Sequence, residues 1–236
     1  PFNDPHATVV NGYYDFHDND LDLGIPSVPK LSNVNGALNF TQYGVNIKDI
    51  TANALGATAH LSAETRESDP KHEMKFTASI PDLDYKDVAY EYLPFLAPII
   101  EGKEDTKIKF TIGKGGLKEL VATSDLRNVS INAPEPLVLQ KDEPRELYLK
   151  ITPETNEPHS PVAIDWRYGD HLKGVQYAGE GLNSYGKIAA GQTGYMENPD
   201  QNSIMTIQGS IESFNIEQWI ATIGKLVGDN KEREHF

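Results

Sequence analysis

Hydrophobic and polar residues alternate along most of the chain, in short runs separated by turn-forming residues. Because successive side chains of a strand point to opposite faces, this alternation predicts strands with one apolar and one polar face. The clearest runs are residues 75–80, 107–112 and 162–168. Further strands are predicted at residues 13–16, 21–25, 37–40, 45–50, 57–63, 117–122, 129–131, 147–151, 172–177 and 204–208. The fold is therefore expected to be mainly β.

Three connections between these strands stand out. The polar residues 17–20 are predicted to form a turn between the first two strands, and the glycine-rich residues 113–116 to form a hairpin turn. Residues 133–145 form a proline-punctuated link. We expect residues 1–236 to form one β segment, with this link as the place where it would divide.

Two segments have the pattern of a helix. Asp84 is predicted to cap a helix over residues 85–96, which Pro94 should kink or shorten. Asn215 is predicted to cap a helix over residues 216–228. The second helix carries a continuous apolar face that includes Ile216, Trp219, Ile220 and Ile223. We expect it to lie on the edge or mouth of the sheet rather than to bind a partner.

Composition excludes several classes of function. The chain has 236 residues, 21 of them basic and 35 acidic, which gives a net charge of −14. Such a field repels phosphate backbones and anionic membranes, so no nucleic-acid partner is expected, and the polar face is expected to be acidic. The absence of cysteine excludes disulfides and thiolate chemistry. No apolar run of about 18 residues occurs, so this segment is not expected to span a bilayer.

No motif in the chain predicts a metal site or a phosphate site. Several acidic residues and one histidine lie close together between Asp15 and Asp22. A calcium loop that starts at Asp18 would need Gly and Glu at the positions that Leu23 and Pro29 occupy. A solvated turn is the preferred interpretation. The glycine-rich residues 113–118 lack the spacing of a phosphate-binding loop. No metal and no cofactor are expected.

No catalytic residue is predicted either. None of the seven histidines forms a metal-binding pair or follows a nucleophile elbow, and His60 lies in an alternating strand, where a structural role is favoured. The leading hypothesis is a protein that works through an apolar surface. Two alternatives to it stay open at this point. One is a closed β-sandwich that binds partners through its edges. The other is a carbohydrate-active enzyme that uses two of the many carboxylates.

Several segments, in the same order, resemble the YhdP family of the AsmA-like superfamily of bacterial envelope proteins. Residues 31–41 are similar to the family's L-x-x-V-x-G-x-L-x-F opening, and residues 124–126 to its SDL element. Residues 207–219 resemble its G-x-L-x-x-L-D-L-D-x-W helix entry. Residues 132–137 resemble its L-P-x-P-L link, although residues 138–141 replace the Gly-Lys that usually follows.

The resemblance implies a long protein anchored in the inner membrane of a Gram-negative bacterium. Its extended antiparallel sheet would bend into a U-shaped groove across the periplasm and carry phospholipid between the inner and outer membranes, which supports the outer-membrane barrier. The chain, which does not begin with Met, would be an internal segment of that groove. Its partners would be phospholipid acyl chains and the adjoining segments of the same protein, with no enzymatic activity.

Alternation along each strand predicts which side chains would line such a groove. They are the apolar positions of the predicted strands, on the face opposite to residues such as Asp165 and Arg167. A slip of one residue in the register of a strand would invert this choice. The predicted lining residues are Leu38, Phe40, Leu61, Phe76, Ile108, Phe110, Leu147, Leu149, Val162, Ile164, Trp166 and Ile207.

Overall fold

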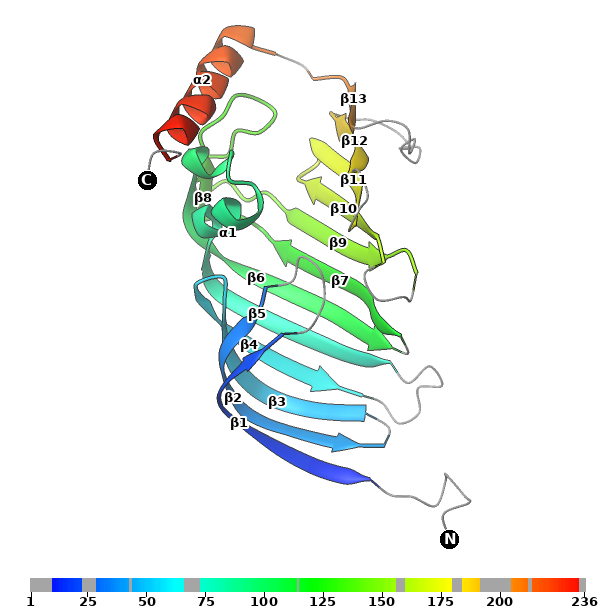
Figure 1. Ribbon diagram of the computed structural model, residues 1–236. Helices are drawn as coiled ribbons and strands as arrows, with labels where there is room; N and C mark the ends of the chain where they lie inside the picture. The colour runs from blue at the N-terminus through cyan, green and yellow to red at the C-terminus, as the bar shows by residue number, and fades with distance from the viewer. Residues whose placement is uncertain are drawn as a thin grey trace.

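A computed structural model describes residues 10–22, 29–42, 44–65, 73–113, 115–155, 160–179, 184–191, 205–211 and 214–233. The described residues form one open, curled sheet (Figure 1). Its strands lie in the order β1-β2-β3-β4-β5-β6-β7-β9-β10-β11-β12-β13, and β8 pairs with β6 off this path. All pairs are antiparallel except β12 with β13. The strands are β1 (Asn11–Leu21), β2 (Leu31–Thr41), β3 (Gly44–Ala54), β4 (Ala57–Glu64), β5 (Met74–Asp84), β6 (Ile100–Gly113), β7 (Gly116–Ser124), β8 (Val129–Ile131), β9 (Leu147–Pro153), β10 (Val162–Tyr168), β11 (Leu172–Ala178), β12 (Tyr185–Ala190) and β13 (Met205–Gly209).

The prediction of a mainly β fold is confirmed, and the alternative of a two-sheet sandwich is wrong for the described residues. Strand follows strand through a single hydrogen-bonded path, so no second sheet packs against the first. Strand β12 was not predicted, because Gly186, Ala189 and Ala190 leave its alternation weak. Residues 23–25 and Ile204, which belong to predicted strands, lie outside the described residues.

The predicted turn at residues 17–20 is wrong, because β1 continues through it. A shift in the register between Phe16 and Asn19 marks a β-bulge, and Asp18 takes a left-handed backbone conformation with φ 51°. Asn35 on β2 holds the bulge: its Oδ1 accepts a bond from the Asp18 N–H at 3.1 Å, and its Nδ2 donates to Asp18 Oδ1 at 3.0 Å. The acidic residues therefore lie along a bulged strand.

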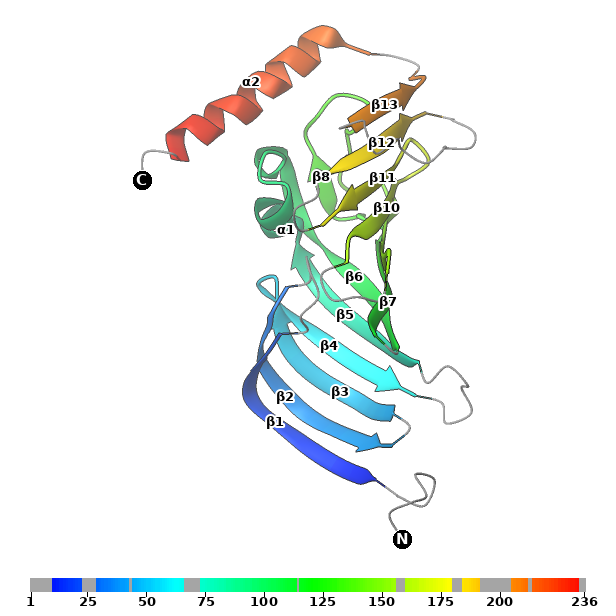
Figure 2. The ribbon, with the colours of Figure 1, turned by 45° about the vertical axis from the view of Figure 1, so that its right-hand side comes forward.

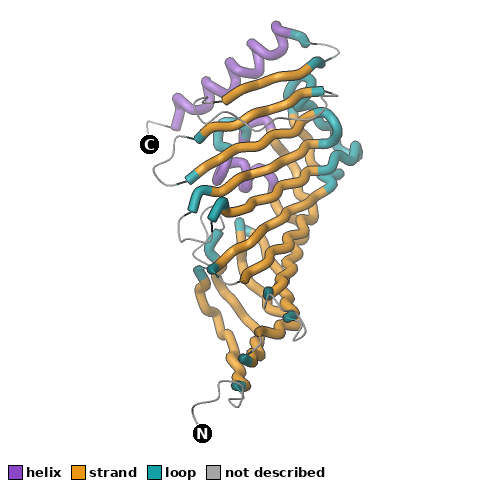
Figure 3. Tube along the Cα trace, turned by 90° about the vertical axis from the view of Figure 1, so that its right-hand side faces the viewer, coloured by secondary structure: helices purple, strands orange, loops and turns teal. Residues whose placement is uncertain are grey.

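Bulges on neighbouring strands give the sheet its curl (Figure 2). Register shifts recur between Ser32 and Asn35 on β2, between Ile47 and Ile50 on β3, and between Ile80 and Leu83 on β5. Each bulge inserts an extra residue on one strand, which bends that strand and increases its twist. Because the bulges fall on β1, β2 and β3 and again on β5, the bends add up across this part of the sheet. Figure 3 shows the resulting column of curved strands.

Helix α1 (Tyr85–Tyr92) follows β5 directly, and Asp84 caps it as predicted, since its side chain accepts a bond from the Lys86 N–H at 3.0 Å. The helix ends before Pro94, so the predicted shortening by proline is confirmed. A short 3₁₀ turn, η2 (Ala97–Ile99), leads into β6. Tyr85 packs in a cluster with Leu126 and Tyr168, and Val88 packs on Ile80 and its neighbours.

Helix α2 (Ile216–Arg233) is longer than predicted and begins after Asn215, whose Oδ1 accepts a bond from the Gln218 N–H at 3.0 Å. It lies beside η2 rather than on the sheet (Figures 1 and 2). The expectation that it lies on the edge or mouth of the sheet stays a prediction. No helix in the described ranges has the length and apolarity needed to cross a bilayer.

The outer face of the sheet carries charges of both signs. Cross-strand register places mostly polar residues on this face, with Lys107, Lys109 and Arg167 beside Glu119 and Asp165, and Lys103 paired with Asp84. That the face is acidic on balance stays a prediction. Sequence alternation locates a polar face, but it does not say how the two signs of charge divide between regions of the fold.

Candidate functional site

The register of the sheet places all twelve predicted lining residues on one face. Leu61 pairs with Ala78, Phe76 with Phe110, and Ile108 with Ala122, so their side chains leave the sheet on the same side. Register partners continue this face toward β13 through Leu149, Trp166, Gly174, Ile188 and Ile207. In the other direction, toward β1, they continue it through Ile47, Leu38 and Tyr14. We call this side the inner face, since α1 and β8 pack against it within the curl.

Apolar contact runs along the inner face without a break. One cluster, built around Val34, Ile50 and Ile80, includes Ile108 at its border. Ile108 also packs against the second cluster, which is built around Phe110, Leu120 and Ile151. Leu149 of that cluster is the register partner of Trp166, which packs in the third cluster with Tyr168 and Leu172. The three clusters therefore form one continuous apolar surface from β1 to β12.

Much of this surface is only partly covered. Phe110 and Ile151 are buried, with 7% and 6% of their surface exposed, but Leu38, Leu61 and Ile164 keep an intermediate exposure. At the last strand Ile207 is 72% exposed. The inner face thus combines tightly packed positions with apolar side chains that solvent reaches. Side chains that alternation did not single out, such as Ile47, Leu120 and Ile188, belong to the same face by register.

Aromatic rings pack on the inner face in two ways, against each other and over glycines. The rings of Phe76 and Phe110, register partners on β5 and β6, stack in parallel with centroids 4.6 Å apart. The Phe40 ring covers Gly12 on β1, in space that a side chain at residue 12 would need. Aromatic side chains that cover cross-strand glycines shield the backbone and keep the profile of the sheet low.

A polar cluster lies beside this apolar surface, where α1 meets β6. The Tyr85 hydroxyl and Thr106 Oγ1 are 2.8 Å apart, and both side chains are buried. Glu104, the neighbouring inner-face residue of β6, is also buried, and its carboxylate accepts bonds from the backbone N–H of Asn128 at 2.8 Å and from Asn128 Nδ2 at 3.1 Å. Each of these groups has a hydrogen-bond partner. The cluster therefore attaches the turn that precedes β8 to strand β6.

Carboxylates are almost absent from the inner face. Among the register-paired residues of that face within the described strands, Glu104 is the one carboxylate, and its oxygens accept the bonds just described. The facing pair of acids that a glycosidase needs therefore does not occur on this face. No group of three or more potential metal ligands occurs among the described residues. His60 lies on the outer face, 3.4 Å from the Asp49 carboxylate.

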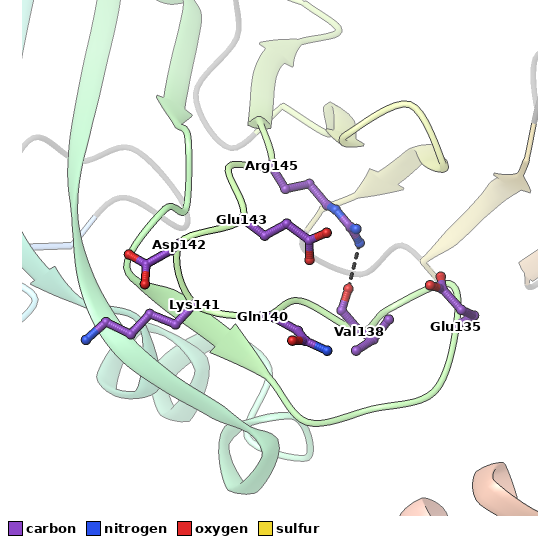
Figure 4. A pocket seen from close by; sticks show the side chains of 7 residues that line it. All are labelled: Glu135, Val138, Gln140, Lys141, Asp142, Glu143 and Arg145. Atoms are coloured by element: carbon purple, nitrogen blue, oxygen red, sulfur yellow. Dashed lines mark hydrogen bonds between the residues drawn. The ribbon is translucent and has the colours of Figure 1, made fainter.

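A polar hollow lies outside the inner face, in the loop between β8 and β9 (Figure 4). Arg145 spans it, donating to the Val138 carbonyl oxygen at 2.7 Å, and its guanidinium lies 4.9 Å from the centre of the Tyr168 ring. These contacts hold the loop to β10, which is a structural role. The hollow is lined by Glu135, Val138, Gln140, Lys141, Asp142, Glu143 and Arg145.

The apolar face of α2 is mostly uncovered. Trp219 docks the helix, since its indole N–H donates to the Glu135 carbonyl oxygen at 3.0 Å. Ile216, Ile220 and Ile223 are 62%, 65% and 51% exposed, respectively. The predicted apolar residues of this helix therefore do not join the inner face of the sheet in the described structure.

Comparison with known proteins identifies a family over the whole chain. The model of the family described as YhdP protein matches residues 1–236. No curated protein and no solved structure matches the chain.

Proposed function

The chain belongs to the YhdP protein family, and on that premise we propose that its inner face shields the acyl chains of phospholipids during transfer between membranes. The continuous apolar surface of the inner face is the observation that carries this proposal. The polar residues lie on the opposite face of the same strands, so a lipid chain on the inner face would meet few charged groups.

The energetics of acyl chains favour such a surface. Exposing a chain of about sixteen carbons to water costs roughly 12 kcal/mol, at about 0.8 kcal/mol for each CH₂ group. A curled apolar face removes most of this cost along its whole length. Tight binding is not needed, because the bilayers at the two ends of the path are equally apolar. An open face without a deep pocket suits movement better than a closed cavity, which would hold one lipid.

The setting of the segment follows from the same proposal. It would lie in the periplasm as one β-groove segment, joined to adjoining segments of a protein anchored in the inner membrane. The division near residues 133–145 stays a prediction, although β7 and β9 pair across this link with five register partners. The segment would act without a cofactor, and catalysis would have no part in its function.

Photo-crosslinking tests the proposal directly. A photoreactive residue at Ile164, Leu149 or Phe110 is expected to capture phospholipid, both in cells and from phosphatidylethanolamine vesicles. Mass spectrometry of the adducts identifies the lipid. Ala163 provides the matched control, because it is the neighbour of Ile164 on β10 but lies on the outer face. Capture at residue 164 without capture at residue 163 would support the proposal, whereas equal capture, or none at the three inner positions, would overturn it.

A further inference from the structure

Two side chains on the inner face carry polar groups that no described residue satisfies. From β5 to β13, the register-paired residues of this face with a side-chain N–H, hydroxyl or carboxyl group are Glu104, Thr106, Ser124, Tyr168, Trp166 and Gln176. The first four are hydrogen-bonded within the chain. The indole N–H of Trp166 and the carboxamide of Gln176 make no hydrogen bond to a described residue.

The two groups lie close together where β10 meets β11. The Trp166 ring covers Gly174, and its Nε1 atom is among the ring atoms nearest to that glycine. Gln176 follows Gly174 by two residues on β11, so its side chain leaves the same face about 6.8 Å further along the strand. Both side chains are partly exposed, so a ligand on the inner face can reach both. We call Trp166 and Gln176 the polar pair.

The surroundings of the polar pair favour an uncharged acceptor group as its partner. Ile164 opposes Gln176 on β10, and Gly186, which has no side chain, opposes it on β12. Ile164 packs against the apolar cluster built around Phe110 and Ile151. The register-paired residues of the inner face in the described strands include no lysine or arginine that would neutralise an anion. The indole and amide N–H groups are donors, so a carbonyl oxygen suits them better than a phosphate.

We propose that the polar pair binds the ester carbonyl oxygens of a phospholipid and so fixes where its glycerol region lies on the inner face. This inference rests on the proposed function, because it names the part of the lipid that the same face would hold. Tryptophan takes a similar place at membrane interfaces, where its ring is apolar and its N–H meets the polar region of the lipid. The acyl chains would then extend from the polar pair over Ile164 and Leu149.

Competition between two lipids tests the inference on the 236-residue chain. One lipid is a diacyl phosphatidylethanolamine, and the other is its dialkyl ether analogue with chains of equal length, which lacks both carbonyl oxygens. A photoreactive residue at Leu149 captures lipid from vesicles that contain equal amounts of the two, and mass spectrometry gives their ratio. The otherwise unaltered chain is expected to capture about threefold or more ester lipid than ether lipid, as one or two hydrogen bonds would give.

Two variants remove the donors while keeping an apolar side chain. Gln176→Leu and Trp166→Phe are each expected to bring the ratio of ester to ether lipid close to one, with capture of the ether lipid changed by less than about twofold. Gln208→Leu is the matched control, because it makes the same substitution at a partly exposed residue on the outer face of β13. This control should keep the preference for the ester lipid. Circular dichroism checks that all three variants keep their strand content.

Three outcomes would overturn the proposal. They are equal capture of the two lipids by the chain without these variants, an ester preference that survives both Gln176→Leu and Trp166→Phe, and equal loss of the preference in Gln176→Leu and Gln208→Leu. In each case lipid is still captured at Leu149, so the result counts against the polar pair and leaves the proposed function standing. Failure to capture either lipid would overturn the proposed function and this inference with it.

Discussion

The indole ring of Trp166 lies over Gly174, its register partner on the neighbouring strand, in the space that a side chain at residue 174 would occupy. The ring therefore rests on the backbone of β11 instead of standing away from the sheet. The same relationship joins Phe40 to Gly12 near the other edge. Bulky aromatic residues thus contribute apolar area to the inner face while keeping it shallow, which would suit the proposed passage of lipid chains.

Replacing Gly174 with valine is expected to displace the Trp166 indole. The added side chain would collide with the ring, so the free energy of unfolding should fall by about 1–3 kcal/mol. Urea denaturation measures this change. Trp166 and Trp219 are the only tryptophans, so a Trp219→Phe background makes the emission of Trp166 a specific reporter, and its maximum should shift to longer wavelength as the ring is displaced.

Gly224→Ala is the control for this substitution. Gly224 lies within α2 and has open space where a Cβ would stand, so alanine should leave stability unchanged or raise it slightly. If Gly174→Val and Gly224→Ala had the same effect on unfolding, the packing of Trp166 on Gly174 would not matter for stability.

The polar cluster at α1 predicts a loss of stability at high pH. Burial raises the pKa of the Tyr85 hydroxyl above its ordinary value near 10. In the unfolded chain this group loses its proton from about pH 10, whereas in the folded chain it keeps it. The folded state then binds more protons, so the free energy of unfolding should fall as the pH rises above about 10. Tyr168 contributes in the same direction, since burial also raises its pKa.

Tyr85→Phe separates the contribution of this residue. The variant should show a weaker decrease in stability above pH 10 than the unaltered chain. At pH 7 it should be less stable by about 1 kcal/mol, because Thr106 loses its buried hydrogen-bond partner. Denaturation at pH 7, 9, 10 and 11 measures both effects. Tyr13→Phe, at a side chain that is 62% exposed, should leave the stability at pH 7 unaltered. A Tyr85→Phe variant with the original pH profile would contradict the assignment.

Trp219 joins α2 to the loop between β8 and β9 through a hydrogen bond. Trp219→Phe removes the hydrogen bond to the Glu135 carbonyl oxygen and is expected to increase hydrogen exchange of the α2 amides several-fold. Ile220→Ala, at a side chain that is 65% exposed, should have little effect on docking. Hydrogen–deuterium exchange with mass spectrometry compares the two variants. Equal exchange in both would show that Trp219 does not anchor the helix.

The strands and the apolar face were predictable because both depend on the two-residue period of a strand. Strand β10 was predicted with its observed limits, and Ile164 and Trp166 lie on the face that alternation assigned to them. The helix caps at Asp84 and Asn215 were equally local properties of the sequence. Whether these apolar residues contact lipid stays a prediction.

The curl, the charge of the outer face and the placement of α2 depend on contacts between distant residues, which local patterns do not contain. The bulge at Asp18 is held by Asn35, seventeen residues away, so residues 17–20 resembled an ordinary polar turn. Helix α2 has a convincing apolar face, but amphipathicity does not name the surface that covers it. Only the register showed that Arg167 and Lys173 are neighbours on the outer face.

A charge on the inner face should block lipid capture while the same charge on the outer face should not. Ile164→Asp places a carboxylate among apolar neighbours, where the acyl chain would have to desolvate it, and is expected to lower phospholipid capture at Leu149 at least tenfold. Ala163→Asp introduces the same group on the opposite face of β10 and should leave capture within twofold of the unaltered chain. A photoreactive residue at position 149 reports on both variants, and circular dichroism verifies their folding. If both variants captured as much lipid as the unaltered chain, lipid would not pass over the inner face at β10.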